Sequence, residues 1–191
     1  MNKSLERIIT NHKTAVEKSF TPLQFKILDL IAREILKTFK TGHKILFCGN
    51  GGSAADSQHI AAEFIARFKR ERKSLPAIAL TTDTSILTAI ANDYDFQQIF
   101  SRQIEGLGQK GDLLIALSTS GKSKNVLQAV RQAKSQGLYT IGLTGGTGGE
   151  LQNQVDLCFT AQSSETSHIQ EVHITALHAV SEVVEEVFFG S

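Results

Sequence analysis

The chain has 191 residues, of which 41% are hydrophobic, and it carries 20 Lys and Arg against 19 Asp and Glu. A chain of this length and composition can bury one sizeable core, and no low-complexity linker divides it, so we expect a single domain over residues 1–191. The balanced charge excludes a general attraction to nucleic acid or to an anionic membrane. The longest apolar runs are too short to span a bilayer, and the N-terminus lacks the apolar segment of a signal peptide. We therefore expect a cytoplasmic protein.

Two amphipathic helices are predicted at the start of the chain. Apolar residues recur at helical spacing over residues 5–9 and again over residues 23–36, and Thr21-Pro22 supplies an N-cap and a first helical residue for the second helix. Together these helices, over residues 1–40, carry more apolar surface than one small sheet can cover. We expect part of that surface to pack against other subunits.

After Gly42 the chain alternates short apolar runs with amphipathic helical stretches. The runs that indicate strands lie at residues 45–48, 77–80, 113–117, 139–143 and 155–159. Continuous apolar strands are buried on both faces, and their alternation with helices indicates a parallel sheet. We therefore expect an α/β three-layer sandwich over residues 43–191, closed by a long helix from about Ser167 to Val187.

Two loops rich in serine and glycine leave apolar runs and enter predicted helices. The first is Cys48-Gly49-Asn50-Gly51-Gly52-Ser53 and the second is Ser118-Thr119-Ser120-Gly121-Lys122-Ser123. Glycine permits a tight strand-to-helix turn, and the free N–H groups at a helix start attract a phosphate. The first loop fits a simple turn with Ser53 as N-cap as well as it fits a ligand contact. The second has four hydroxyl residues in six positions, more than one N-cap requires, which favours phosphate binding.

Two pairs of side chains are candidates for chemistry. His59 and Glu63 lie at i and i+4 on one face of a helix predicted over residues 53–69, a spacing that suits a shared metal, an acid/base pair or a surface hydrogen bond. Gln170 and His178 lie about two turns apart on the final helix, and they can face a common cleft only where that helix lines it. Neither pair alone establishes a site.

Three other features are expected to be structural. The basic stretch over residues 67–73 is predicted to be a solvated helix end, with its cations near the helix C-terminus. Cys48 and Cys158 lie in strand-like runs, which suits small buried hydrophobic side chains better than a disulfide or a metal pair. His173 lies on an apolar helix face and is expected to be a core residue.

Taken in chain order, the motifs closely resemble those of the phosphoheptose isomerases. The segments that carry the resemblance are residues 48–59 with Glu63, then 75–84, Asn92-Asp93-Tyr94, 118–121 and 169–173. The resemblance covers nearly the whole chain from about residue 43. It implies a sugar isomerase (SIS) domain with a five-stranded parallel sheet and helices on both faces. It also implies a homotetramer whose active sites are built at subunit interfaces.

The activity implied by the resemblance is the conversion of sedoheptulose 7-phosphate to D-glycero-D-manno-heptose 7-phosphate, the first committed step toward the heptose of bacterial lipopolysaccharide. Aldose–ketose isomerisation moves one proton between C1 and C2 and another between O1 and O2, so it needs a base that reaches carbon and an acid that reaches oxygen. A carboxylate and an imidazole supply both. A cation near the carbonyl could stabilise the enediolate or simply hold the site together.

The resemblance also implies roles for single residues. One zinc ion per subunit would be held by four residues: His59, Glu63, Gln170 and His178. Two of these, Glu63 and His178, would also be the catalytic acid/base pair. The residues implied to contact the sugar are Asn50, Gly51, Ser53, Asp93 and Gln170, with a helix or turn cap as the alternative role of Asp93. Those implied to bind the phosphate are Ser118, Thr119, Ser120 and Ser123.

Two positions depart from the family pattern. Asp95 stands where Gly is usual, and His168 stands where Arg is common. Loss of a fixed cation at residue 168 would weaken an interface ion pair or a substrate contact, because imidazole is mostly neutral near pH 7.

Two other functions compete with the isomerase. One is a non-catalytic SIS binding protein of the replication-initiator-associating type, which would not need Glu63 and His178 together. The other is a different phosphosugar isomerase or a sugar-phosphate sensor. A sensor would normally carry a separate DNA-binding domain, for which the chain has no room outside its two N-terminal helices.

Overall fold

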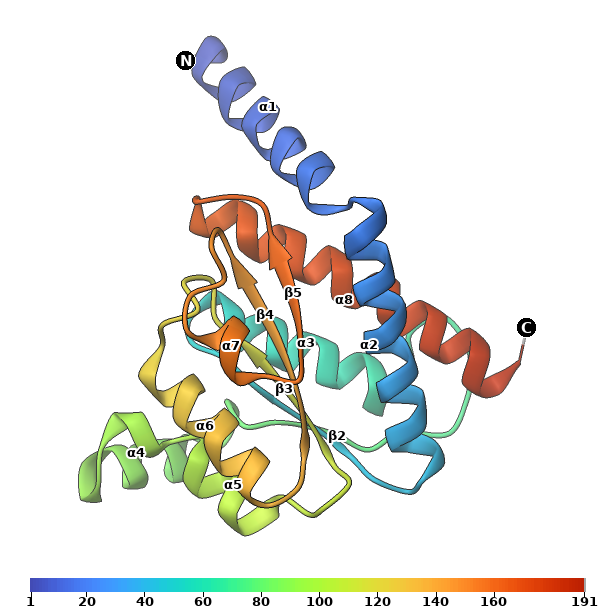
Figure 1. Cartoon of the computed structure of the whole chain (residues 1–191), viewed down its shortest axis with the longest axis vertical. Helices are drawn as coiled ribbons and strands as arrows, with labels where there is room; N and C mark the ends of the chain where they lie inside the picture. The colour runs from blue at the N-terminus through green and yellow to red at the C-terminus, as the bar shows by residue number, and fades with distance from the viewer. Residues whose placement is uncertain (191) are drawn as a thin grey trace.

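The computed structural model describes residues 1–190 and shows a five-stranded, fully parallel sheet between two layers of helices (Figure 1). The strands are β1 (Ile45–Cys48), β2 (Ala77–Ala79), β3 (Leu113–Leu117), β4 (Tyr139–Gly145) and β5 (Leu157–Ala161). Their order across the sheet is β2-β1-β3-β4-β5. The expected α/β sandwich is thereby confirmed, with β5 starting two residues later than predicted because Asp156 is bonded to Thr140 at the end of the preceding loop.

The helices divide between the two faces of the sheet. One face is covered by α2 (Pro22–Lys40), α3 (Gly52–Ile65) and α8 (Thr166–Phe189), and the other by α5 (Ser101–Leu107), α6 (Lys124–Ser135) and the short α7 (Leu151–Gln154). Alternate residues of one strand enter the two cores: Phe47 packs with the first group and Leu46 with the second. The continuous apolar strands of the sequence are therefore buried on both sides.

The remaining helices lie outside these two layers. They are α1 (Asn2–Ser19), α4 (Thr84–Asp93) and the 3₁₀ helix η1 (Phe96–Gln98). The predicted start of α2 is confirmed, since Thr21 is its N-cap and accepts a hydrogen bond from the backbone N–H of Gln24, with Pro22 as first residue.

The prediction for residues 67–73 is wrong. α3 ends at Ile65, four residues before the expected end, and the basic stretch that follows is not a solvated helix end. Its Arg72 side chain is 2% exposed and pairs with Glu185 of α8, with 2.7 Å between Nε and Oε1. The backbone N–H groups of residues 68–70 donate to the same carboxylate, so a side chain of α8 replaces the helical carbonyls that would have continued α3.

The cysteines and His173 lie as predicted. Cys48 is buried and Cys158 partly buried, both are free, and burial raises their thiol pKa values to about 12 and about 11. His173 is fully buried, and its Nε2 lies 2.8 Å from the carbonyl oxygen of Thr144. Burial lowers the pKa of His173 to about 4 despite that contact, so its imidazole is a neutral core group.

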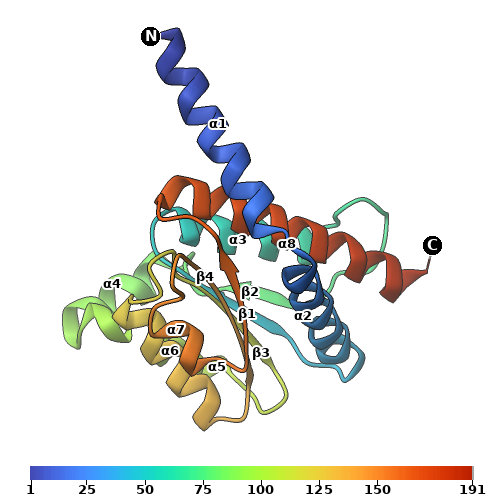
Figure 2. The same cartoon turned by 45° about the horizontal axis from the view of Figure 1, so that its top comes forward.

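Helix α1 projects from the body of the molecule (Figures 1 and 2). Its apolar residues Leu5, Ile8 and Ile9 are exposed. At its base, an apolar groove of about 510 Å³ runs between α1, α2 and α8 and is lined by Val16, Phe20, Phe25, Leu28, Asp29, Ala32, Thr175, Ala179, Val180 and Val183. Among the described residues, no helix combines the length and the apolarity needed to cross a membrane.

Candidate active site

The order of the strands brings the two serine-glycine loops together. β1 and β3 are neighbours in the sheet, and each is followed by one of the loops. The first loop leads into α3 on one face, and the second leads into α6 on the other. In an open parallel sheet, chains that leave adjacent strands for opposite faces open a crevice at the strands' carboxyl ends, which is where ligands bind.

A pocket of about 290 Å³ lies at this crevice. Its lining is formed by Asn50, Gly51, Gly52, Ser53, Leu117, Ser118, Thr119, Ser123, Thr166 and Gln170. Seven of the nine residues predicted to bind substrate are among them: Asn50, Gly51, Ser53, Ser118, Thr119, Ser123 and Gln170. Both loops and the start of α8 therefore face one small polar cavity.

Side-chain hydrogen bonds join the first loop to the start of α6 and close the second loop on itself. The amides of Asn50 and Asn125 bond reciprocally, with Nδ2 to Oδ1 distances of 2.9 and 2.8 Å. The hydroxyl of Ser118 donates to that of Ser123 at 3.0 Å. Ser123 occupies the N-cap position of α6, but its side chain makes no cap bond to the helix. The hydroxyl groups in this loop thus exceed what capping uses, as the sequence indicated.

The first loop depends on glycine. Gly51 is the N-cap of α3 with φ of 56°, and the helix has no side-chain cap bond, so the interpretation of Ser53 as N-cap is wrong. Ser53 is instead buried in the first turn. A Cβ on Gly52 would lie 2.3 Å from Nε2 of Gln170. Glycine at residue 52 therefore allows the amide of Gln170 to lie against the turn.

A third glycine-rich loop, which the sequence analysis missed, supports the second serine-glycine loop. It spans residues 145–149, which contain four glycines. Gly121 has φ of 63°, and a Cβ there would lie 2.1 Å from the carbonyl oxygen of Gly148. The N–H of Leu151 donates to the carbonyl of Gly121 at 3.0 Å. The run of glycines was a visible signal, but its partner is distant in the sequence.

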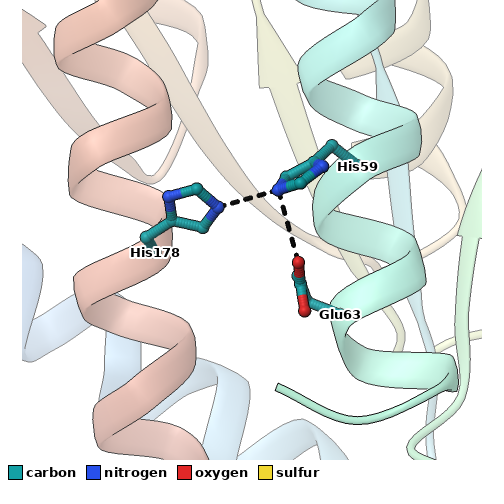
Figure 3. A group of neighbouring side chains, drawn as sticks. All are labelled: His59, Glu63 and His178. Carbon is teal, nitrogen blue, oxygen red and sulfur yellow. Dashed lines mark hydrogen bonds and ion pairs between the residues drawn. The ribbon is translucent and has the colours of Figure 1, made fainter. Parts of the chain in front are cut away.

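His59, Glu63 and His178 converge from two helices (Figure 3). Nε2 of His59 lies 2.8 Å from Nε2 of His178 on α8 and 3.3 Å from Oε1 of Glu63 on its own helix. One potential ligand atom from each residue lies within 4.8 Å of the others. The i, i+4 pair predicted on α3 is therefore joined by the histidine predicted on α8.

The electrostatics of this cluster favour neutral imidazole at His178. Burial lowers the pKa of His178, nearby His59 lowers it further, and the carboxylate of Glu63 opposes both effects. Neutral imidazole is the form that binds a metal. Two imidazole nitrogens and a carboxylate oxygen suit Zn²⁺, whose tetrahedral site places neighbouring ligand atoms about 3.3 Å apart. The 2.8 Å between Nε2 of His59 and Nε2 of His178 would have to lengthen slightly to meet that requirement.

The polar pocket and the His-Glu cluster lie along the same pair of helices. Gly52 of α3 contacts Gln170 of α8, and His59 of α3 contacts His178 of α8, so the two helices run side by side in the same direction. Seven residues separate the two contacts on α3 and eight on α8, which at the helical rise is roughly 10–12 Å. The structure thus has a hydroxyl-lined pocket and a His-Glu cluster at a set spacing.

Two residues predicted to bind substrate are not in the pocket lining. Ser120 is exposed, and its hydroxyl accepts a hydrogen bond from the N–H of Lys122 at 3.2 Å. Asp93 is exposed at the end of α4, and its carboxylate accepts from the side chain of Asn92. Gln170 lines the pocket, about two turns before His178 on α8. Substrate contacts of Ser120 and Asp93, and zinc binding by Gln170, stay predictions.

The two positions that depart from the family pattern have local partners. Asp95 is exposed and accepts from the N–H of Gln97 at 2.7 Å, which begins η1. His168 is buried near the start of α8, with its ring centroid 5.5 Å from that of His12. Nδ1 of His12 lies 2.7 Å from the carboxylate of Glu171. Residue 168 therefore contacts the projecting helix α1.

Three further polar residues escaped the sequence analysis. Thr166 lines the pocket at the first position of α8, and Asn125 holds Asn50. Asp56 lies one turn before His59, and its Oδ2 is buried without a hydrogen-bond partner among the described residues. Burial raises the pKa of Asp56 to about 6, although His59 opposes the shift. Each is a common residue type in an ordinary local pattern, so only its neighbours in the fold reveal it.

Comparisons with known proteins agree with this geometry. The SIS domain model matches residues 9–145. The chain is 54% identical over 174 residues to a phosphoheptose isomerase of a Roseiflexus species, covering 91% of this chain and 88% of that protein. It is 50% identical to one from a Nitratiruptor species, covering 98% and 100%.

Solved structures of phosphoheptose isomerases are also similar to this chain. Phosphoheptose isomerase GmhA from Neisseria gonorrhoeae superposes with a TM-score of 0.92 at 38% identity, covering 97% of this chain and 98% of that one. A phosphoheptose isomerase from Francisella tularensis superposes with a TM-score of 0.88 at 34% identity, covering 96% and 98%. Matches of this identity over most of both chains show that the chain belongs to the phosphoheptose isomerase family of SIS domain proteins.

Proposed function

We propose that this chain isomerises sedoheptulose 7-phosphate to D-glycero-D-manno-heptose 7-phosphate, the first committed step toward the heptose of lipopolysaccharide. The observation that carries the proposal is the alignment of α3 and α8, along which both the hydroxyl-lined pocket and the His59, Glu63 and His178 cluster lie. The two free cysteines, Cys48 and Cys158, suit the reducing cytoplasm in which we place the protein.

The spacing along the two helices suits a seven-carbon substrate. Pocket and cluster are separated by roughly 10–12 Å of helix. An extended heptose spans on the order of 8–10 Å from C1 to the phosphate on C7 at ordinary bond lengths. With the phosphate held by the loop of residues 118–123, C1 and C2 reach the cluster, and Asn50, Ser53 and Gln170 flank the carbon chain between them.

Glu63 and His178 are proposed to move the protons. The carboxylate of Glu63 takes a proton from C1 of the ketose, and the resulting enediol is reprotonated at C2 to give the aldose. His178 exchanges protons with O1 and O2, for which its lowered pKa keeps a neutral imidazole available near pH 7. The two groups come from different helices, so they can act on opposite sides of the C1–C2 bond.

Zinc is proposed to bind at His59, Glu63, Gln170 and His178. The convergence of two imidazole nitrogens and a carboxylate oxygen supports three of these ligands. Gln170 is proposed as the fourth ligand because the family resemblance implies it and because it lines the neighbouring pocket. When bound, the cation would polarise the substrate carbonyl and stabilise negative charge on the enediolate oxygen.

The non-catalytic alternative is disfavoured by the cluster. A protein that only binds a sugar phosphate or another protein needs no carboxylate and imidazole directed at one point, and exposed polar clusters of this kind add little to the stability of the fold. The alternative of a different phosphosugar isomerase shares the chemistry and differs in substrate length. Turnover of sedoheptulose 7-phosphate, compared with that of a six-carbon phosphosugar, distinguishes the proposed activity from both alternatives.

The first prediction concerns the chemistry. Purified protein converts sedoheptulose 7-phosphate in D₂O to an aldose that carries deuterium at C2, because the enediol takes its proton from an exchanging side chain. Glu63→Gln and His178→Gln each lower kcat by about 10²–10⁴-fold, since each removes a general acid or base. Product is followed by mass spectrometry and NMR, with zinc content measured in every variant.

Glu105→Gln is the matched control for Glu63→Gln. The Glu105 side chain is exposed on α5, across the sheet from the cluster, and pairs with Arg102 at 2.9 Å, so its loss leaves turnover unchanged. Near-normal turnover by folded Glu63→Gln or His178→Gln would remove that residue from catalysis. No turnover by the unaltered protein would favour the binding-protein alternative, and preference for a six-carbon phosphosugar would favour the other isomerase.

The second prediction concerns zinc. Protein purified without chelator contains about one zinc ion per chain, and His59→Ala weakens zinc binding by more than the roughly 10–100-fold that loss of a ligand's hydrogen-bond partner costs. Competition with a chromogenic chelator measures the affinity. His43→Ala is the control, because His43 lies before β1 at the opposite end of the sheet and pairs with Asp112. Equal zinc affinity in the two variants would place the metal elsewhere.

The third prediction concerns the phosphate. Ser123→Ala raises KM for the phosphosugar by about 10–100-fold, the effect of losing one hydrogen bond to a charged group, with a smaller change in kcat. Ser120→Ala, tested in parallel, raises KM less, because Ser120 is exposed and lies outside the pocket lining. Ser135→Ala, at the exposed far end of α6, is the control. Unchanged KM in Ser123→Ala would exclude this serine as a phosphate ligand.

The fourth prediction concerns assembly. We propose a homotetramer with active sites at subunit interfaces, and the exposed apolar residues of α1 and the groove at its base support a contact between copies. Light scattering then gives four chains per particle, and Ile8→Glu with Ile9→Glu dissociates it. Thr14→Glu, on the opposite side of the same helix, leaves it assembled. A stable monomer at micromolar concentration of the unaltered protein would contradict this proposal.

A further inference from the structure

The carboxylate of Glu185 organises the segment of residues 66–73, which connects α3 to β2. Glu185 is 3% exposed, on the last third of α8. It accepts hydrogen bonds from the backbone N–H groups of residues 68, 69 and 70 at 3.1, 2.8 and 3.1 Å, and from Nε of Arg72 at 2.7 Å. A buried charge with this many donors is satisfied, and it fixes a segment that has no regular secondary structure.

We call Glu185 and Arg72, with the backbone N–H groups that Glu185 binds, the buried clamp. Arg72 extends this clamp to the end of α3. Its Nη2 donates to the carbonyl of Glu63 at 2.7 Å, and its Nη1 donates to the carbonyl of Phe64 at 2.8 Å. Carbonyls in the last turn of a helix lack helical partners, so Arg72 caps α3 at its C-terminus. The backbone of Glu63 is thereby tied, through one buried guanidinium, to Glu185 on α8.

Phe68 extends the clamp to His178. Its ring stacks on the imidazole of His178 with centroids 5.7 Å apart and an interplanar angle of 30°. The other side of the cluster is His59, whose ring meets His178 edge-on at 5.0 Å. Because the N–H of Phe68 donates to Glu185, the ring that bounds His178 is anchored seven residues further along the same helix.

The geometry points to the 66–73 segment as a positioning element for the acid/base pair, held by Glu185 and Arg72. Phe68 sets the plane of the His178 imidazole, and Arg72 sets the end of α3 that carries Glu63. This inference rests on the proposed function, because it assigns a use to the segment in that reaction. A displacement of about 1 Å at a reacting group lowers turnover by about 10²-fold, so such an element has a measurable role.

A purely structural role is the competing explanation. Buried ion pairs contribute little net stability compared with apolar residues of similar volume, so stability alone does not account for an Arg and a Glu here. A structural segment would also have no need to contact both members of the pair. Arg72 contacts Glu63 and Phe68 contacts His178, through two residues of one short segment.

Phe68→Leu tests the inference, because it keeps an apolar side chain but removes the ring face. We expect kcat to fall by about 10–100-fold with KM within about twofold, since the phosphate pocket is untouched and only the reacting groups shift. Arg72→Lys keeps a cation beside Glu185 but loses the guanidinium fork that reaches the carbonyls of Glu63 and Phe64. We again expect kcat to fall while KM stays nearly unchanged. Phe188→Leu is the matched control, because Phe188 packs on Phe39 away from the cluster.

A second measurement is independent of activity. In protein labelled with ¹³C at histidine Cε1, the His178 signal, assigned from His178→Gln, carries a ring-current shift from Phe68 that disappears in Phe68→Leu and persists in Phe188→Leu. Loss of the shift together with the fall in kcat supports the positioning role. Loss of the shift with unchanged kcat, or a shift that persists in Phe68→Leu, overturns it. An unaltered protein without isomerase activity would instead overturn the proposed function, while the NMR result still reports whether the stack exists.

Discussion

The neighbouring positions of β1 and β3 are the constraint on which the site depends. Chains that leave these two parallel strands must diverge, one to α3 and the other to α6, and the space between them opens at the strand ends. The glycines at residues 51, 52 and 121 allow the backbone to turn within that space. Hydroxyl groups and helix N-termini then face one small cavity, which is the arrangement that an anion requires.

The packing of α8 against α3 brings His59, Glu63 and His178 together at a set distance from that cavity. Both helices cover the same face of the sheet, where Ile60 and Phe64 of α3 share a core with Val172 and Leu177 of α8. That apolar contact fixes how the helices are aligned along their length. The alignment pairs Gly52 with Gln170 and His59 with His178, so the spacing between the hydroxyl-lined pocket and the His-Glu cluster is a property of the core.

Local patterns in the sequence predicted the elements and the candidate side chains, but not their long-range partners. The strands, the N-cap at Thr21 and the His59 and Glu63 pair follow from period and spacing within a few residues. The end of α3 could not be predicted in this way, because Glu185, which ends it, lies 113 residues beyond Arg72. Asn125 and the glycine loop at residues 145–149 escaped for the same reason, since their partners lie in loops that follow other strands.

The buried clamp and the site respond differently to pH. Burial alone would raise the pKa of Glu185, but the N–H of Lys69, the guanidinium of Arg72 and the N–H of Phe68 together hold it below its ordinary value of 4.5. A carboxyl with a lowered folded-state pKa contributes stability that is fully present above its unfolded-state pKa and is lost as the pH falls through the folded value. Glu185 therefore remains charged near neutrality, and titration of His178 changes the charge at the site without loosening the segment that bounds it.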